Sequence, residues 1–483
     1  MKFEKQVSLK WAIALVLIAC LVSSSIVYYA IAVSPSSAFT ISSGVYPGAP
    51  SYTVWGEGGY YFAKDANGEI DYSGTNASQI INYAINSLTS GRTWIETVLL
   101  KGSFTLTSEI ILANYTRLVM YDAKLFLANG VNRPMIRNYN PKLHSRTIEI
   151  FGGYLDGNKD GQTLNATVEG HGVCGIEFTN TTDFTIKDTY IENAHLDGIA
   201  LASSGYGLVS NVHSNKNLWD GITILYNSFA ITVSDCHLYQ NGRAGIVTDG
   251  VYADVKVSVV NIIGNTVVGS LGLEPVSGGI VLEWSREILV SNNQVYDCVE
   301  NCYDSGYGIE AASVSFSEIS SNVVYNNDAI GIYLQCDAQN NLIKDNKVTS
   351  SGDSGIVVFN AVGAGNNAII GNQIYDSLAH GILVYQSNRT FVSGNSLANN
   401  GAGASGSSGI YLSASSNCTV SSNKVYDSDD YELKIGSGSN YNMVVGNDLR
   451  QTAPGTHTGS FLDSGTGTKA HDNLGDSGWL AET

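Results

Sequence analysis

A short pattern, Gly-Ile-x-apolar, returns ten times between Gly175 and about Leu449. The two apolar side chains within each copy lie two residues apart, which is the period of a β-strand, so they face the same side of a sheet. Successive copies are separated by 23 to 34 residues. The copies begin at Gly175, Gly198, Gly221, Gly245, Gly279, Gly308, Gly331, Gly355, Gly381 and Gly409. A period of about 20 to 30 residues made of short strands predicts a solenoid, in which each coil buries its apolar face against the next.

A second pattern, apolar-x-x-Asn-x-apolar, lies between copies of the first. Its asparagines are Asn293, Asn322, Asn346, Asn372, Asn395, Asn423 and Asn447. A recurrent asparagine is typical of a bend with left-handed backbone, and its amide can bond to the coils on either side. Each period therefore holds at least two strands, and we expect like positions in successive coils to lie roughly 4.8 Å apart.

The N-terminus carries an apolar run over residues 11–33, preceded by three lysines. The run is long enough to span a bilayer, and the lysines place its N-terminus in the cytoplasm. An Ala-Ile-Ala sequence at residues 30–32 also offers a cleavage site, so residues 1–33 are predicted to be a signal anchor or a signal peptide. We expect the rest of the chain to be extracellular, at the cell surface on a membrane anchor or secreted after cleavage.

Residues 34–50 have the composition of a short stalk, and residues 51–483 form the predicted domain. Apolar positions at helical spacing occupy residues 79–88, with a capping residue before them and Gly91 after them. We expect a helix near residues 78–88. It would cover the first coil, because a solenoid must shield the exposed edge at its end.

Three features precede the Gly-Ile repeats: this helix, a Val-Leu-Leu-x-Gly-x-Phe-x-Leu strand at residues 98–106, and Gly-Tyr-Leu-Asp-Gly-Asn at residues 153–158. With them the chain resembles the pectin-lyase-like superfamily over about residues 52–475. The resemblance implies an all-β fold, a single-stranded right-handed parallel β-helix that binds polysaccharide along a groove on one sheet. It leaves the reaction open, because lyases, hydrolases, C-5 epimerases, tailspikes and adhesins share the scaffold. The sequence lacks both Asp-Pro-His-Asp/Glu of mannuronan C-5 epimerases and Trp-Ile-Asp-His of pectate lyases.

The chain holds 43 acidic and 25 basic residues, a net charge of −18. This balance argues against a nucleic-acid partner, because phosphate binding needs a clustered basic face. An acidic polysaccharide would approach such a surface through local Arg or Lys, or through bridging Ca²⁺, which is therefore a candidate cofactor. The sequence identifies no set of metal ligands.

Six cysteines follow the N-terminal apolar run. Among them, Cys298 and Cys302 are four residues apart, without the second pair or nearby His that a zinc site needs. The spacing favours a loop disulfide, and buried free cysteines are the alternative.

Two Asp-Gly pairs, at Asp197 and Asp220, stand one coil apart, which places their carboxylates roughly 5 Å from each other. Like charges this close raise one pKa, so the pair suits acid/base catalysis or a Ca²⁺ site. The neighbouring candidates are His195 and Lys216 as bases in a lyase or epimerase, and Arg243 to neutralise a uronate carboxylate. Asp-Gly is also a turn signal, and an aspartate that bonds the next backbone amide at a coil corner is the alternative.

Substrate-binding candidates come chiefly from outward positions of the Gly-Ile strands, with acids in the first half and aromatic residues in the second. They are Glu177, Trp219, Asp249, Glu283, Tyr333, Tyr385 and Tyr411. Aromatic rings stack on sugars, although tyrosine is also ordinary on a sheet surface.

Two functions follow from these patterns. The first is an extracellular enzyme that acts on a polysaccharide, neutral or acidic, as a lyase, a glycoside hydrolase or a C-5 epimerase. The second is a non-catalytic surface or adhesion protein that binds glycans. The candidate catalytic residues favour the first function, and the missing reaction motifs favour the second.

Overall fold

The computed structural model describes residues 48–164, 172–250, 254–360, 365–403, 406–451, 458–480 and 482 of the 483-residue chain. The chain divides into two compact units, Met1–Ser42 and Ser43–Thr483, and the described residues belong to the second. The predicted membrane-spanning segment, residues 11–33, lies outside them, as does most of the stalk. Within the described ranges, no helix combines the length and apolarity that crossing a membrane requires.

The domain begins with a small antiparallel unit and one helix. Strand β2 (Tyr60–Asp65) pairs with both β1 (Tyr52–Glu57) and β3 (Ile70–Gly74), and β1 leads into the parallel sheet by pairing with β4 (Glu96–Leu106). Helix α2 (Ala77–Asn86), the one α-helix in the described part of the chain, is capped at its N-terminus by Asn76, whose side chain accepts the backbone N–H of Gln79. Its apolar face joins the core of the first coil, as the sequence predicts for a capping helix.

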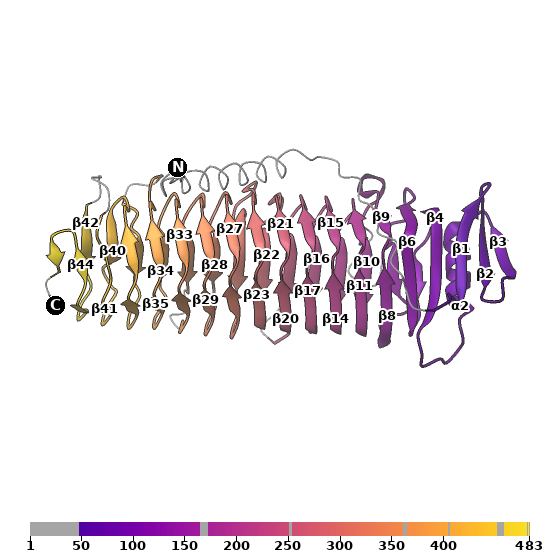
Figure 1. The fold of residues 1–483 in the computed structure, drawn as a ribbon, viewed down its shortest axis with the longest axis horizontal. Coiled ribbons are helices and arrows are strands. Elements are labelled where there is room, and N and C mark those ends of the chain that lie inside the picture. Colours follow the sequence, from indigo (N-terminus) through magenta and orange to yellow (C-terminus); the bar gives the residue numbers. More distant parts are fainter. Residues whose placement is uncertain are drawn as a thin grey trace, which may run out of the picture. The chain divides into compact units, whose positions relative to one another are not determined.

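The ten Gly-Ile copies lie in one fourteen-stranded parallel sheet, in which neighbouring strands follow each other in chain order (Figure 1). We call it sheet B. Its strands are β5 (Ile110–Leu112), β7 (Ile136–Asn138), β10 (Ile176–Thr179), β13 (Ile199–Ala202), β16 (Ile222–Leu225), β19 (Ile246–Asp249), β22 (Gly278–Glu283), β25 (Tyr307–Ala312), β28 (Ile332–Gln335), β31 (Ile356–Phe359), β34 (Ile382–Tyr385), β37 (Ile410–Ser413), β40 (Tyr431–Ile435) and β42 (Gly459–Asp463).

The remaining coil strands form sheet A, which has two parallel columns. The first column contains β4 (Glu96–Leu106), β6 (Thr116–Leu127), β8 (Ser145–Phe151), β11 (Thr181–Lys187), β14 (Gly205–Ser210), β17 (Phe229–Ser234), β20 (Val257–Ile263), β23 (Ser285–Ser291), β26 (Glu318–Ser320), β29 (Leu342–Lys344), β32 (Ala368–Ile370), β35 (Phe391–Ser393), β38 (Thr419–Ser421), β41 (Met443–Val445) and β43 (Lys469–His471). The second contains β9 (Tyr154–Asp156), β12 (Tyr190–Glu192), β15 (His213–Asn215), β18 (His237–Tyr239), β21 (Thr266–Val268), β24 (Gln294–Tyr296), β27 (Val323–Tyr325), β30 (Lys347–Thr349), β33 (Gln373–Tyr375), β36 (Ser396–Ala398) and β39 (Lys424–Tyr426). A short antiparallel pair, β44 (Leu474–Gly475) and β45 (Gly478–Trp479), follows.

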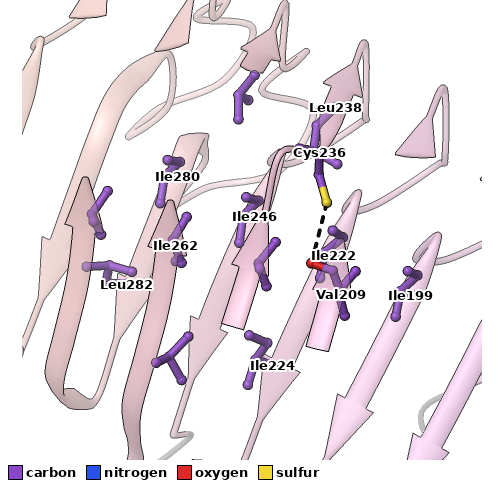
Figure 2. Packing of buried hydrophobic residues seen from close by; sticks show 14 of the residues in the cluster. Ile199, Val209, Ile222, Ile224, Cys236, Leu238, Ile246, Ile262, Ile280 and Leu282 are labelled. Carbon is purple, nitrogen blue, oxygen red and sulfur yellow. Dashed lines mark hydrogen bonds between the residues drawn. The ribbon is translucent and has the colours of Figure 1, made fainter. Parts of the chain in front are cut away.

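The isoleucines of the repeated pattern line the core. Ile199, Ile222 and Ile246 are register partners on neighbouring strands and have no exposed surface (Figure 2). The preceding glycines leave no room for a side chain: a Cβ at Gly331 would lie 2.4 Å from Val348 Cγ1 and 2.7 Å from the carbonyl oxygen of Gly355. Close packing between coils therefore explains why glycine precedes isoleucine in each copy.

The repeated asparagines form a hydrogen-bonded ladder through the buried bend between the two columns of sheet A. Asn322 donates its backbone N–H and its Nδ2 to Asn346 Oδ1, each at 2.9 Å, and also donates Nδ2 to the carbonyl oxygen of Val290 at 2.9 Å. The ladder consists of Asn265, Asn293, Asn322, Asn346, Asn372, Asn395, Asn423, Asn447 and Asn473. The left-handed residue is the one before the asparagine, such as Ser321 with a φ of 56°, so the predicted bend lies one residue earlier.

The predicted disulfide between Cys298 and Cys302 is wrong, because both thiols are free. The Cys298 side chain points into the hydrophobic core and is 1% exposed, whereas Cys302 lies in the loop that follows.

Candidate functional site

Two positions on each Gly-Ile strand point away from the core, on what we call the outer face of sheet B. Parallel register aligns these positions from coil to coil. Thus Asp249 on β19 pairs with Glu283 on β22, and Glu310 on β25 pairs with Tyr333 on β28. Asp197, Asp220, Asp249, Glu283 and Glu310, together with Arg243, are here called the acidic cluster.

Asp197 and Asp220 lie side by side at equivalent coil corners. Asp197 Oδ1 accepts the backbone N–H of Asp220 at 3.1 Å, and Asp220 Oδ1 accepts that of Ala244 at 3.0 Å. The two aspartates are 0% and 1% exposed. Each carboxylate thus satisfies a backbone amide of the next coil, which is the geometry of the corner alternative. A catalytic role for this pair stays a prediction.

Arg243 binds Asp220 from the following coil. Its Nε and Nη2 donate to Asp220 Oδ1 and Oδ2, each at 3.0 Å, and its Cζ lies 5.9 Å from the centre of the Trp219 ring. Burial raises the pKa of Asp220, and the guanidinium opposes this rise. Burial by itself would lower the pKa of Arg243, but the Asp220 carboxylate outweighs it and leaves that pKa above its usual range.

Trp219, a predicted substrate-binding residue, packs against a small apolar cluster outside the main core. The cluster contains Cys174, Leu196 and Ala200. Glu177, another predicted binding residue, is 1% exposed, and its Oε1 accepts the Thr179 hydroxyl at 3.3 Å. Turn residues thus cover the outer face of sheet B over these early coils.

Asp249 and Glu283 are the two members of the acidic cluster with partly exposed carboxylates. They occupy paired positions on neighbouring strands. Burial, and to a smaller extent the negative charge of Asp249, raise the pKa of Glu283 to about 7 against the opposing effect of Arg243. A pair of neighbouring carboxyl groups, one of which titrates near neutrality, can supply both an acid and a base.

Glu310 is a further member of the cluster that is not among the predicted site residues, although alternation along its Gly-Ile strand indicates that it points outward. The residue has no exposed surface, and its Oε1 accepts a hydrogen bond from Gln335 Nε2. Among the described residues, Oε2 has no hydrogen-bond partner. Burial raises the pKa of Glu310 to about 8, so this side chain is largely protonated at neutral pH.

Lys159, the first residue of the one-turn helix η1 (Lys159–Gly161), makes a hydrogen bond with each of the predicted bases, His195 and Lys216. His195 Nδ1 lies 2.9 Å from the Lys159 carbonyl oxygen, and Lys159 Nζ donates to the Lys216 carbonyl oxygen at 2.6 Å. The Lys216 side chain is exposed. No hydrogen bond among the described residues links either side chain to Asp197 or Asp220. The structure therefore does not join these bases to the aspartate pair.

The later coils carry the predicted aromatic residues on the same outer face. The Tyr385 ring is 38% exposed and stacks on Phe359 at 5.1 Å. Tyr411 lies 5.1 Å from the His380 ring and 5.4 Å from Lys434 Nζ. Tyr333 packs 5.1 Å from the Tyr307 ring, next to the acidic cluster. We call Tyr333, Phe359, Tyr385 and Tyr411 the aromatic row.

Metal ligation has no direct support in the part of the chain that the structure describes. There, no three His, Cys, Asp or Glu side chains come together as a metal site would require. The Ca²⁺ suggested by the charge balance stays a prediction.

Comparison with known families decides the classification. The model of the family described as "Right handed beta helix region" matches residues 151–295 and 359–477, more than half of the chain. The chain belongs to this right-handed β-helix family. Its fold is that of the pectin-lyase-like superfamily, as the sequence resemblance implies. The model of a second family, "Periplasmic copper-binding protein (NosD)", matches residues 260–403 of this β-helix. A comparison with curated proteins finds no match.

Solved β-helix structures resemble this one at low sequence identity. The A-module of Azotobacter vinelandii mannuronan C-5 epimerase AlgE6 is 15% identical, with a TM-score of 0.50, over 83% of this chain and 95% of that chain. The Streptococcus pneumoniae surface protein and adhesin PfbA is 14% identical, with a TM-score of 0.43, over 82% and 94%. The Thermotoga maritima exopolygalacturonase is 12% identical, with a TM-score of 0.41, over 84% and 89%. At such identities the likeness extends to the fold alone.

Proposed function

We propose that this β-helix is a glycoside hydrolase that acts on a polysaccharide outside the cytoplasm, with Asp249 and Glu283 as its catalytic pair. The observation that carries the proposal is the pairing of two partly exposed carboxylates on neighbouring strands, one of them with a pKa raised by burial to about 7. An acid for protonating a leaving group and an anion beside it are what glycosidic cleavage needs.

The strand spacing favours retention of configuration at the anomeric carbon. Neighbouring strands lie about 4.8 Å apart, close to the roughly 5–5.5 Å that separates the two carboxyl groups of retaining enzymes. Glu283 would donate its proton to the glycosidic oxygen while an Asp249 oxygen bonds to the anomeric carbon, and the leaving sugar departs as an alcohol. Water would then attack that carbon, lose a proton to Glu283 and release Asp249.

The aromatic row supports a polysaccharide as the substrate. Its rings continue along the outer face of sheet B from the acidic cluster, and Tyr385 is accessible for stacking on a sugar ring. The name of the AlgE6 epimerase, whose fold this chain shares, also denotes an enzyme that acts on a polysaccharide. A location outside the cell or in the periplasm accords with the export segment predicted at the N-terminus and with the periplasmic NosD family.

A second candidate function is proton abstraction at C-5 of a uronate, as in a lyase or an epimerase. The charge of Arg243 beside Asp220 and Glu283 favours it, because a guanidinium can offset the uronate carboxylate. The non-catalytic alternative, a glycan-binding surface protein, needs only the aromatic row.

A panel of neutral and acidic polysaccharides, tested with Ca²⁺ and with chelator, separates these functions. Reducing ends without ultraviolet absorbance indicate hydrolysis, unsaturated products indicate a lyase, and a changed uronate composition by NMR indicates an epimerase. Glu283→Gln and Asp249→Asn should each abolish hydrolysis, whereas Glu318→Gln, on the outer face of sheet A, should not. Hydrolysis that survives both site substitutions refutes the catalytic pair, and binding without any product supports the surface protein.

A further inference from the structure

A hollow of about 530 Å³ opens at the N-terminal end of the β-helix. Its walls come from three segments: the end of α2 and the turn after it (residues 85–93), the turn before β6 (residues 113–115), and the connection from β7 to β8 with the first two residues of β8 (residues 139–146). None of these residues belongs to the acidic cluster or the aromatic row. The volume lies within the range of sites that enclose small ligands, about 300–1,000 Å³.

The hollow is basic, in contrast to the chain as a whole. The described residues that line it include Arg92, His144 and Arg146, and they include no Asp or Glu. The whole chain carries 43 acidic against 25 basic residues. Basic side chains in a hollow whose described lining holds no carboxylate favour an anionic ligand.

Arg146 has a fixed backbone and an available charge. Its N–H donates to Asn114 Oδ1 at 3.0 Å, and its carbonyl oxygen accepts the N–H of Tyr115 at 3.2 Å. The Arg146 Cζ lies 5.5 Å from the centre of the Tyr115 ring. The side chain is exposed, and no carboxylate in the described part of the chain comes within ion-pair distance of it. The guanidinium can therefore bind an incoming anion bidentately.

Arg92 also lines the hollow and binds the backbone of Tyr115. It is 9% exposed and donates to the carbonyl oxygens of Tyr115 and Thr89, each at 3.1 Å, and to Thr116 Oγ1 at 2.6 Å. These three acceptors are neutral, and Arg92 also forms an ion pair with Glu96, whose Oε2 lies 3.9 Å from Arg92 Nε. Arg92 thus holds the Tyr115 backbone in place, and Glu96 offsets its positive charge.

We propose that this hollow binds one or two residues of an acidic sugar, with the sugar carboxylate on Arg146. Asparagine amides at Asn86, Asn114 and Asn140 line the hollow and can bond sugar hydroxyls, and Tyr139, 62% exposed, offers a ring for stacking. The ligand would be a free uronic acid or the end of a polysaccharide chain. The inference does not rest on the proposed hydrolase activity, because the two sites share no residue.

Calorimetry or NMR titration with glucuronate, galacturonate and glucose, alongside polygalacturonate, tests the proposal on the purified chain. Both uronates should bind and glucose should not. Arg146→Gln should weaken uronate binding about ten- to a hundred-fold, the loss expected for one charge-assisted contact. Arg286→Gln, which changes an exposed arginine on β23, is the matched control and should bind as the wild type does. Circular dichroism and a thermal melt establish that each variant is folded.

The arms of the experiment also separate the two sources of the ligand. Binding of monosaccharides indicates a site for a free uronic acid, whereas binding of polygalacturonate alone, lost in Arg146→Gln, indicates capture of a chain end. Glucose that binds as well as glucuronate overturns the proposal, because the charge would then have no role. Uronate binding unchanged in folded Arg146→Gln also overturns it, as does the absence of binding to every probe at millimolar concentration.

Discussion

Replacing Asn346 with alanine removes a central rung of the asparagine ladder. Asn346 Oδ1 accepts the backbone N–H and the Nδ2 of Asn322, both at 2.9 Å, and Asn346 Nδ2 donates to Asn372 Oδ1 at 3.0 Å and to the Ile319 carbonyl oxygen at 2.9 Å. Asn346 is 1% exposed, so water does not replace these partners freely. Four buried hydrogen bonds at about 1 kcal/mol each give an expected loss of about 4 kcal/mol in the free energy of unfolding.

Urea denaturation of residues 51–483, followed by circular dichroism, measures this loss. Asn261→Ala is the matched control, because Asn261 is a partly exposed strand residue whose amide makes a single long bond, 3.4 Å, to Thr232. The control should lose no more than about 0.5 kcal/mol. A second variant, Asn346→Asp, keeps the acceptor but sets an oxygen against Asn372 Oδ1, so at neutral pH it should be at least as unstable as Asn346→Ala. An Asn346→Ala variant as stable as the control would show that the ladder contributes no net stability.

Three further predictions concern the outer faces of the two sheets. Because burial raises the pKa of Glu310 from 4.5 to about 8, the contribution of this residue to stability is complete below pH 4.5 and is lost as the pH rises through 8. Thermal melts across this pH range should therefore show a decline in stability that Glu310→Gln flattens. If the decline is the same in Glu310→Gln and the wild type, the raised pKa of Glu310 is refuted. Asp220→Ala leaves the buried Arg243 charge unpaired and should lower the free energy of unfolding, measured by urea denaturation, by about 3 kcal/mol. Glu318→Ala removes one partner of the exposed Glu318–Lys344 pair and should lower it by only about 0.5 kcal/mol, so equal losses would contradict this reasoning. Tyr385→Ala should weaken polysaccharide binding about tenfold in affinity electrophoresis without changing stability, whereas Tyr206→Ala, 62% exposed on sheet A, should leave binding intact.

Most of the fold can be predicted from the sequence, because periodicity reports directly on burial. The Gly-Ile pattern predicts that Ile199, Ile222 and Ile332 face the core, and all three have no exposed surface. The second pattern predicts stacked asparagine amides, which the ladder confirms. In both cases the same side chain meets its own equivalent in the next coil, so one local pattern determines a long-range contact.

Which side chains are exposed on the outer face of sheet B could not be predicted in this way. Alternation indicates that Val247 and Val281 point outward, but both are fully buried, because Val276 from the long interval between Gly245 and Gly279 packs on them. The sequence gives the length of such an insertion and not its path. The burial of Asp197 could not be predicted from the sequence either. The sequence makes Asp197 a candidate catalytic acid, whereas the partly exposed carboxylates in the structure are those of Asp249 and Glu283.

The ladder is also directional. The carbonyl of every amide in it points to the preceding coil, and Nδ2 donates onward to the next asparagine as far as Asn473. Aligned amide dipoles polarise one another, so an interior rung is strengthened from both sides and a terminal rung from one side only. The same substitution should therefore cost less at Asn265 or Asn473 than at Asn346, and of these two terminal rungs only Asn473 lies near an end of the stack, where coils should separate first.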